Sequence, residues 1–106
     1  MKSCVVRFFF LSAAFAVAAI AGSAEGKTVF TAKCQGCHGA AGEGKDAIAK
    51  MMKVTMQPLG SKEVQSKSDA DIKKVITTGQ GKMKPVAGLS DAQATDVVSF
   101  VRTLKK

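Results

Sequence analysis

The stretch Cys34-Gln35-Gly36-Cys37-His38 decides how this chain of 106 residues is interpreted. Two cysteines three positions apart can form thioethers with the two vinyl groups of one porphyrin. The adjacent histidine can then bind the iron from the proximal side. The pattern therefore predicts one covalently attached haem at Cys34 and Cys37, with His38 as an axial ligand of the iron.

The beginning of the chain has the three parts of an export signal. Lys2 and Arg7 give it a basic start, residues 8–24 carry no charge, and small residues at the end of this run suit a signal peptidase. Cleavage is expected after Ala21 or after Ala24. Residues 1–24 are thus predicted to be a signal peptide, and residues 25–106 a single domain. The uncharged run is just long enough to span a membrane, so an uncleaved anchor is the alternative.

Other uses of a Cys-x-x-Cys pair suit the chain less well. A structural zinc site wants four Cys or His ligands, whereas Cys34, Cys37 and His38 are all that residues 25–106 contain. A thioredoxin-like pair should follow a strand in an alternating pattern of strands and helices, and that pattern is missing. A disulfide that closes so small a loop would stabilise the fold little.

The predicted domain is poor in material for a hydrophobic core. It has no Trp and no Tyr, and its two aromatic residues are Phe30 and Phe100. Domains of this size often need a bound cofactor, a metal or disulfides in addition to their hydrophobic core to be stable. A haem would supply the missing apolar mass, and we expect it to be buried among Val29, Phe30, Ile72, Ile76, Leu89, Val97 and Val101.

The apolar periodicity predicts an all-α fold, and no alternating pattern indicates a strand. Ser90 and Gln93 have the spacing of a capping box before a helix with an apolar face of Ala94, Val97, Val98, Val101 and Leu104. Phe100 is expected at the edge of this face.

Four further helical segments are expected. Ser68 begins one whose inner face carries Ile72, Val75 and Ile76, and Gly79 is expected to end it in the left-handed conformation. The others span about residues 26–35, 46–52 and, as a short turn, 62–65. Glycine-bearing loops are expected over residues 39–44 and 79–89.

The second axial ligand is predicted to be Met83. His38 is the only histidine, so a second histidine is excluded, and a thioether is a soft, neutral ligand that favours reduced iron. Met51, Met52 and Met56 fall within or just beyond a helical pattern, where methionine usually fills core space. Met83 lies instead on a loop rich in glycine and lysine, where iron ligation would bury its sulfur.

These features together resemble the class I cytochromes c of the short bacterial type. Gly26 and Phe30 resemble the family's N-terminal helix, whose small residue lets the C-terminal helix cross closely, and Phe100 resembles the aromatic residue that packs there. Gly39 after His38 also fits, and Gly81-Lys82-Met83 followed by Pro85 resembles the distal methionine loop. The resemblance implies three to five helices around one covalent haem c, with the N- and C-terminal helices crossing.

The chain departs from the family's pattern at two places. Lys84 stands between Met83 and Pro85, whereas many relatives have proline directly after the ligand methionine. In mitochondrial relatives a Gly-Pro-x-Leu segment provides the backbone carbonyl that accepts the imidazole N–H of the proximal histidine. That segment is absent here, and Pro58-Leu59 lies too far along the chain to be assumed equivalent.

The predicted function follows from the two filled axial positions. Without an open site on the iron, the expected activity is one-electron transfer in the periplasm and not an enzymatic reaction. The alternatives are a five-coordinate haem protein for ligand binding or peroxidase-like activity, and a membrane-anchored subunit of a respiratory complex.

The excess of basic over acidic residues indicates which partners the protein binds. Residues 25–106 carry 14 Lys and Arg against 8 Asp and Glu. We expect a monomer whose redox partners have acidic docking surfaces, with Lys82 and Lys84 steering the encounter. Nucleic acid is not an expected partner, because the chain is predicted to be exported and lacks aromatic residues for base stacking.

Overall fold

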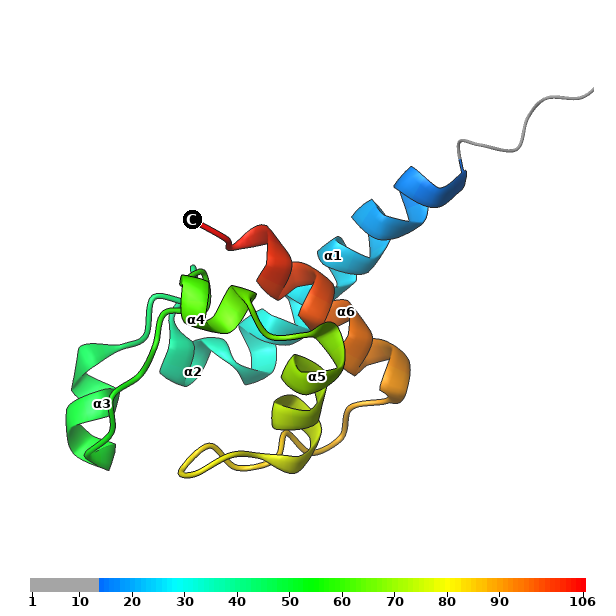
Figure 1. Ribbon diagram of the computed structural model, residues 1–106. Coiled ribbons are helices and arrows are strands. Elements are labelled where there is room, and N and C mark those ends of the chain that lie inside the picture. Colours follow the sequence, from blue (N-terminus) through cyan, green and yellow to red (C-terminus); the bar gives the residue numbers. More distant parts are fainter. Residues whose placement is uncertain (1–13) are drawn as a thin grey trace, which may run out of the picture.

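The computed structural model describes residues 14–106, with side chains from residue 22 onward, so the first 13 residues of the predicted leader lie outside it. The described part is helical and contains no strand, which confirms the all-α prediction. Its helices, shown in Figure 1, are α1 (Ala14–Lys33), α2 (Gln35–His38), α3 (Asp46–Met52), α4 (Lys62–Gln65), α5 (Asp69–Thr78) and α6 (Asp91–Thr103).

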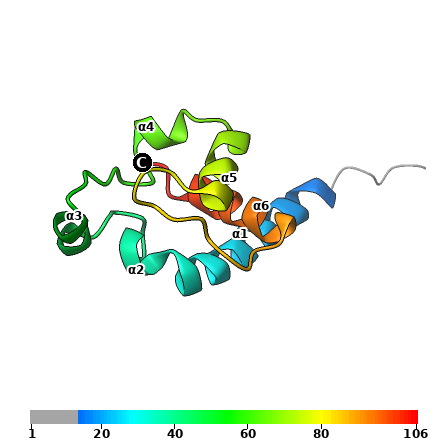
Figure 2. The same cartoon turned by 90° about the horizontal axis from the view of Figure 1, so that it is seen from below.

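The first and last long helices cross and form the frame of the molecule (Figures 1 and 2). The crossing is close because Gly26 has no side chain: a Cβ atom there would lie only 2.5 Å from the carbonyl carbon of Asp96 and 3.0 Å from Cβ of Phe100. One turn further along α1, the rings of Phe30 and Phe100 pack with their centroids 5.0 Å apart and their planes tilted by 53°. The predicted crossing of the terminal helices is therefore confirmed.

The predicted capping box at the start of α6 is also confirmed. The Ser90 hydroxyl accepts a hydrogen bond from the Gln93 backbone N–H at 3.1 Å, and the Gln93 side chain accepts one from the Ser90 backbone N–H at 2.9 Å. The two bonds satisfy N–H groups that the helix itself cannot pair. Phe100, which was expected at the edge of the apolar face, is buried in a separate cluster with Phe30 and Cys34, whereas Val97, Val98 and Val101 belong to another cluster.

Helix α5 begins as predicted and ends differently. The Ser68 hydroxyl accepts from the Asp71 backbone N–H at 3.1 Å, and Ile72 and Ile76 are buried. Gly79 does have a positive φ of 81°, but its ψ of 170° is extended and not left-handed helical. The chain leaves the helix axis at once, because a turn that begins at the next residue follows directly.

The N-terminal helix differs most from its predicted bounds of 26–35. It begins earlier, at Ala14, because the residues before Gly26 are rich in alanine, the strongest helix former. It ends at Lys33, and Cys34 separates it from α2. The interruption is slight, since the Cys34 backbone N–H still donates to the Phe30 carbonyl at 2.8 Å.

The shorter helices α3 and α4 have the bounds that the sequence predicts. None of the helices in residues 14–106 combines the length and the apolar character that a membrane-spanning helix requires.

Candidate haem site

The residues of the haem motif lie on one helical turn at the junction of α1 and α2. The backbone N–H groups of Cys37 and His38 both donate to the Cys34 carbonyl, at 3.3 Å and 3.0 Å. Cys34 is buried beside Phe30 and Phe100, whereas Cys37 is exposed, and both thiols are free. Burial raises the pKa of the Cys34 thiol, and the neighbouring Lys33 charge partly opposes this rise. The structure thus brings together the three side chains that the sequence selected.

The imidazole of His38 is half-buried, and its Nδ1 atom is buried without a hydrogen-bond partner. Burial lowers the pKa of His38 because the charged form loses its hydration. The ring is therefore neutral at physiological pH, which is the form that binds a metal. A metal-binding histidine normally donates its second ring N–H to a carbonyl or carboxylate, and Nδ1 of His38 has no such acceptor among the described residues.

The loop after the motif folds back on it. The Gly44 backbone N–H donates to the His38 carbonyl at 2.6 Å, and the Lys45 N–H donates to the Cys37 carbonyl at 3.1 Å. The Glu43 carboxylate accepts from the Ala41 backbone N–H at 3.0 Å. Hydrogen bonds from its own backbone and from that of Ala41 lower the pKa of Glu43. These contacts fix the loop that follows His38.

The segment around Pro58 packs against this loop, although it lies 20 positions beyond His38 in the chain. The Leu59 backbone N–H donates to the Gly42 carbonyl at 2.8 Å. The Gln65 side-chain amide donates to the Leu59 carbonyl at 2.8 Å and to the Val101 carbonyl at 3.0 Å, which ties the segment to α6. No carbonyl of the described residues accepts a hydrogen bond from Nδ1 of His38, so the carbonyl that holds the proximal histidine in mitochondrial relatives has no counterpart in this part of the chain.

Arg102 holds the same region from α6. Its guanidinium donates to the Gln65 and Lys67 carbonyls at 2.9 Å and 2.7 Å, and it pairs with the Asp69 carboxylate at 2.7 Å. The sequence patterns gave no indication of these contacts of Gln65 and Arg102. Both have partners more than 30 positions away in the chain, and no local pattern marks such pairs.

Met83 lies in a tight turn of the distal loop, which is defined here as residues 79–85. Gln80 and Met83 exchange two backbone hydrogen bonds, both of 2.9 Å. Immediately after the loop, the Val86 N–H donates to the Ile76 carbonyl of α5 at 2.9 Å. Met83 is half-buried.

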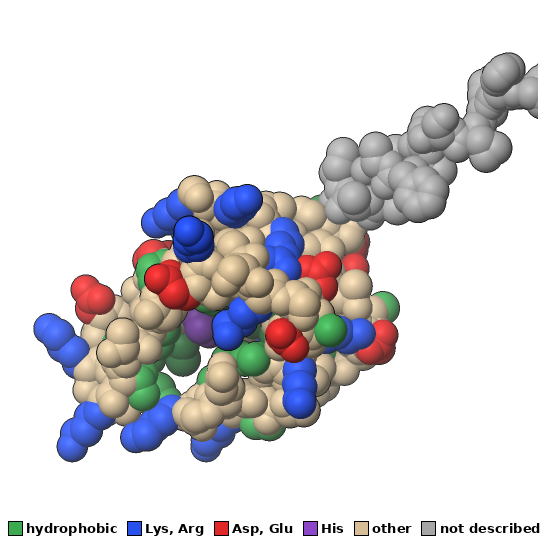
Figure 3. All heavy atoms as spheres, in the orientation of Figure 1, with side chains coloured by type: hydrophobic (Ala, Val, Ile, Leu, Met, Phe, Trp, Pro, Cys, Tyr) green, Lys and Arg blue, Asp and Glu red, His purple; other side chains and the backbone are tan. Residues whose placement is uncertain are grey.

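An opening lies between α3 and the distal loop. Figure 3 shows that hydrophobic side chains line much of it, with the imidazole of His38 at its inner edge. Both bordering segments carry half-buried apolar side chains, Ile48 and Met52 in α3 and Met83 in the loop. A flat apolar group attached at Cys34 and Cys37 would be in contact with such side chains, so the residues present fit a haem.

Comparison with known proteins decides the family. The Cytochrome c family model matches residues 23–105, most of the chain. The chain belongs to the cytochrome c family. Members of this family bind haem c covalently, and this cytochrome therefore carries it too. The family generally transfers electrons and does not catalyse substrate reactions, and its domains are typically exported.

A solved structure supports the same assignment. The cytochrome resembles the KustC0563 c-type cytochrome with a TM-score of 0.67 and 26% sequence identity, over 76% of this chain and 98% of that one. None of the curated proteins with which the sequence was compared matches it.

The residues predicted to surround the haem fall into two clusters in this cytochrome. Ile72, Ile76, Val97 and Val101 are buried in one cluster, against which Val29 and Leu89 pack. Phe30 belongs to the other, with Cys34 and Phe100. The first cluster comes from α5 and α6, and the second joins the haem motif to the helix crossing.

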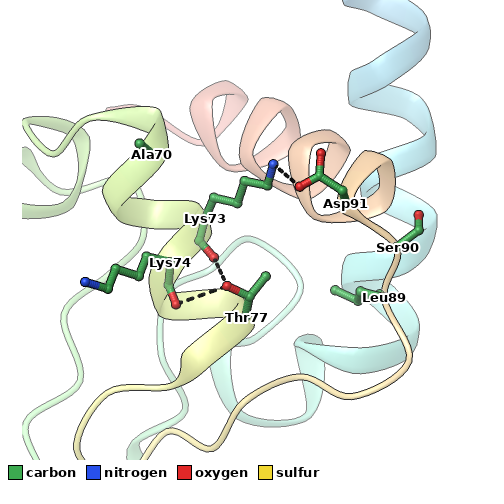
Figure 4. A pocket seen from close by; sticks show the side chains of 7 residues that line it. All are labelled: Ala70, Lys73, Lys74, Thr77, Leu89, Ser90 and Asp91. Carbon is green, nitrogen blue, oxygen red and sulfur yellow. Dashed lines mark hydrogen bonds and ion pairs between the residues drawn. The ribbon is translucent and has the colours of Figure 1, made fainter.

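A second concave site lies between α5 and the start of α6, away from the haem motif. Its lining residues, shown in Figure 4, are Ala70, Lys73, Lys74, Thr77, Leu89, Ser90 and Asp91. Lys73 is paired with Asp91, and the Thr77 hydroxyl donates to the carbonyls of Lys73 and Lys74. Several of its polar groups are thus already paired within the protein.

Proposed function

We propose that this cytochrome is an exported carrier of single electrons with one haem. Cys34 and Cys37 would form the two thioether bonds, and His38 and Met83 would be the axial ligands of the iron. When bound, haem supplies one iron that alternates between the ferric and ferrous states. With both axial positions filled by the protein, no position is open for a substrate, and electron transfer is the remaining chemistry.

The observation that carries the proposal is the half-buried, neutral imidazole of His38, one helical turn from both free cysteines. His38 follows Cys37 directly and lies on the same helical turn as Cys34, so the ring is close to both attachment points. On the other side, the turn between Gln80 and Met83 fixes the backbone of Met83 by two hydrogen bonds. The thioether of Met83 would favour the reduced iron and so raise the potential.

The location and partners belong to the same proposal. The basic start and uncharged run of residues 1–24 support export to the periplasm and cleavage after Ala21 or Ala24. The excess of Lys and Arg supports docking to acidic redox partners. We infer a monomer that moves between its electron donor and acceptor.

A redox titration of the purified holoprotein tests the function. A single wave with a slope of about 59 mV per tenfold change in the ratio of oxidised to reduced protein is expected for one electron. Carbon monoxide should bind the reduced protein poorly, because it must displace Met83. Rapid and complete binding of carbon monoxide at neutral pH would instead support a five-coordinate haem protein. Mass spectrometry of the periplasmic protein would report both the attached haem and the cleavage site.

A further inference from the structure

Helix α1 runs through both bonds at which the leader could be cut, after Ala21 and after Ala24. The two cuts leave different first helices in the mature protein. After the first cut, a full turn of residues 22–25 precedes Gly26, whereas after the second only Glu25 does. The contacts of this turn therefore distinguish the two sites.

The turn of residues 22–25 takes part in the crossing of α1 and α6 (Figure 1). Gly22 stands four positions before Gly26, so the two glycines lie on the same face of α1. Both lie against Asp96 of α6, Gly26 beside its backbone carbonyl and Gly22 beside its carboxylate. Gly22 and Ser23 are half-buried, so the first turn belongs to the packed domain.

A cut after Ala24 would remove this turn. The residues at a chain end are poorly ordered unless other contacts hold them, and the close contact at Gly26 would then lie at a frayed helix end. The Thr28 hydroxyl, which donates to the Ala24 carbonyl at 3.4 Å, would lose its acceptor. A cut after Ala21 keeps Gly26 within an ordered helix and keeps this hydrogen bond.

The carboxylate of Asp96 lies where the first of these cuts would create a new chain end. A Cβ atom at Gly22 would lie 3.3 Å from Oδ1 of Asp96 and 3.9 Å from the hydroxyl oxygen of Ser99. Asp96 is half-buried and belongs to neither ion pair found among the described residues. A partly buried carboxylate is stabilised by a cation beside it, so this position suits a positive group.

An amino-terminal glycine can bring its nitrogen to this carboxylate. Once the bond to Ala21 is cut, the Gly22 ammonium is free to rotate about the Cα–C bond. A rotation of about 120° moves the nitrogen into the place that a Cβ would occupy, because both atoms are bonded to Cα at similar distances. There the nitrogen would lie about 3.3 Å from Oδ1 of Asp96, which is within reach of an ion pair.

We propose that a signal peptidase cuts between Ala21 and Gly22 and that the new ammonium of Gly22 pairs with the carboxylate of Asp96. The inference rests on the export proposed above. As the peptide bond breaks, water adds its hydroxyl to the Ala21 carbonyl carbon and a hydrogen to the Gly22 nitrogen. At neutral pH the amine takes up a proton, and the new Ala21 carboxyl group releases one. Removal of the leader thus creates the cation that holds the start of α1 against α6.

Mass spectrometry of the exported holoprotein tests the cleavage site, and the mature chain should begin at Gly22. Ala21→Phe should abolish the product that begins at Gly22, because the peptidase requires a small residue just before the cut. Ala24→Phe is the matched control and should leave this product unchanged. A mature chain that begins at Glu25 would overturn the inference and leave export intact. A chain that keeps residues 1–21 would refute export as well.

The ion pair is tested by removing the ammonium alone. Transamination with pyridoxal phosphate converts an amino-terminal glycine into an uncharged glyoxylyl group, and urea unfolding of the holoprotein before and after this treatment gives its effect on the equilibrium constant for unfolding. The treatment should favour unfolding about threefold more in the parent protein than in Asp96→Asn. Glu63→Gln, which removes an exposed carboxylate from α4, is the control of matched charge and should behave like the parent protein. An effect of equal size in Asp96→Asn and in the parent protein would overturn the ion pair.

Discussion

Replacing Gly26 by alanine perturbs the closest contact between α1 and α6. The added Cβ would lie 2.5 Å from the Asp96 carbonyl carbon and 3.0 Å from Cβ of Phe100, whereas carbon atoms pack best at about 3.5–4.0 Å. The Asp96 carbonyl oxygen lies closer still, so the helices must separate by at least about 1 Å, which is an overpacking cost of about 1–3 kcal/mol. Separation also loosens the Phe30–Phe100 pair, a loss of about 0.5–1.5 kcal/mol. Alanine regains up to about 1 kcal/mol of helix propensity.

The expected net effect is a fall of about 2 kcal/mol in the free energy of unfolding. Unfolding of the oxidised holoprotein in urea, followed by circular dichroism, measures it. Gly36→Ala is the matched control, because no atom lies within 4 Å of the added Cβ in the described part of the chain. That variant should be unchanged or more stable by up to about 1 kcal/mol. The reasoning is refuted if Gly26→Ala is as stable as Gly36→Ala.

Two further variants test the contacts that hold the segments next to the haem motif in place. Gln65→Ala removes the donor to the Leu59 and Val101 carbonyls, and urea unfolding should show a loss of about 1–3 kcal/mol. Gln57→Ala, at an exposed position, is the control, and equal losses in both would contradict the assigned role. Glu43 has a lowered pKa, so it stabilises the folded state above its unfolded pKa and loses this effect as the pH falls through its folded pKa. The difference in urea midpoint between the parent protein and Glu43→Gln should therefore be present at neutral pH and vanish in acid; a difference independent of pH would argue against it.

The sequence predicts those parts of this fold that depend on neighbours in the chain. The capping box at Ser90, the bounds of α3 and the apolar face of α6 all follow from patterns within a few residues. The haem motif is likewise local, because its three side chains share one helical turn. The close approach of α6 to Gly26 could be expected only through the resemblance to the family. A single glycine in a helix does not by itself indicate which other helix packs against it.

The remaining features depend on distant partners. Gln65 reaches Val101, 36 positions away, and Arg102 reaches carbonyls 35 and 37 positions away. Long polar side chains can find partners in many directions, so their roles become visible only when the chain is folded. The approach of Gly60 to the Leu104 carbonyl is of the same kind. The unpaired Nδ1 of His38 also depends on which carbonyls the tertiary structure brings near it.

The visible absorption spectrum of the oxidised protein tests the central claim most directly. A ferric haem ligated by a methionine sulfur has a weak band at long wavelength, and the account predicts this band in the parent protein. It should be lost in Met83→Ala and kept in Met56→Ala, the control at another half-buried methionine. A parent protein without the band, or a band that survives Met83→Ala, would contradict the assignment of His38 and Met83 as the axial ligands.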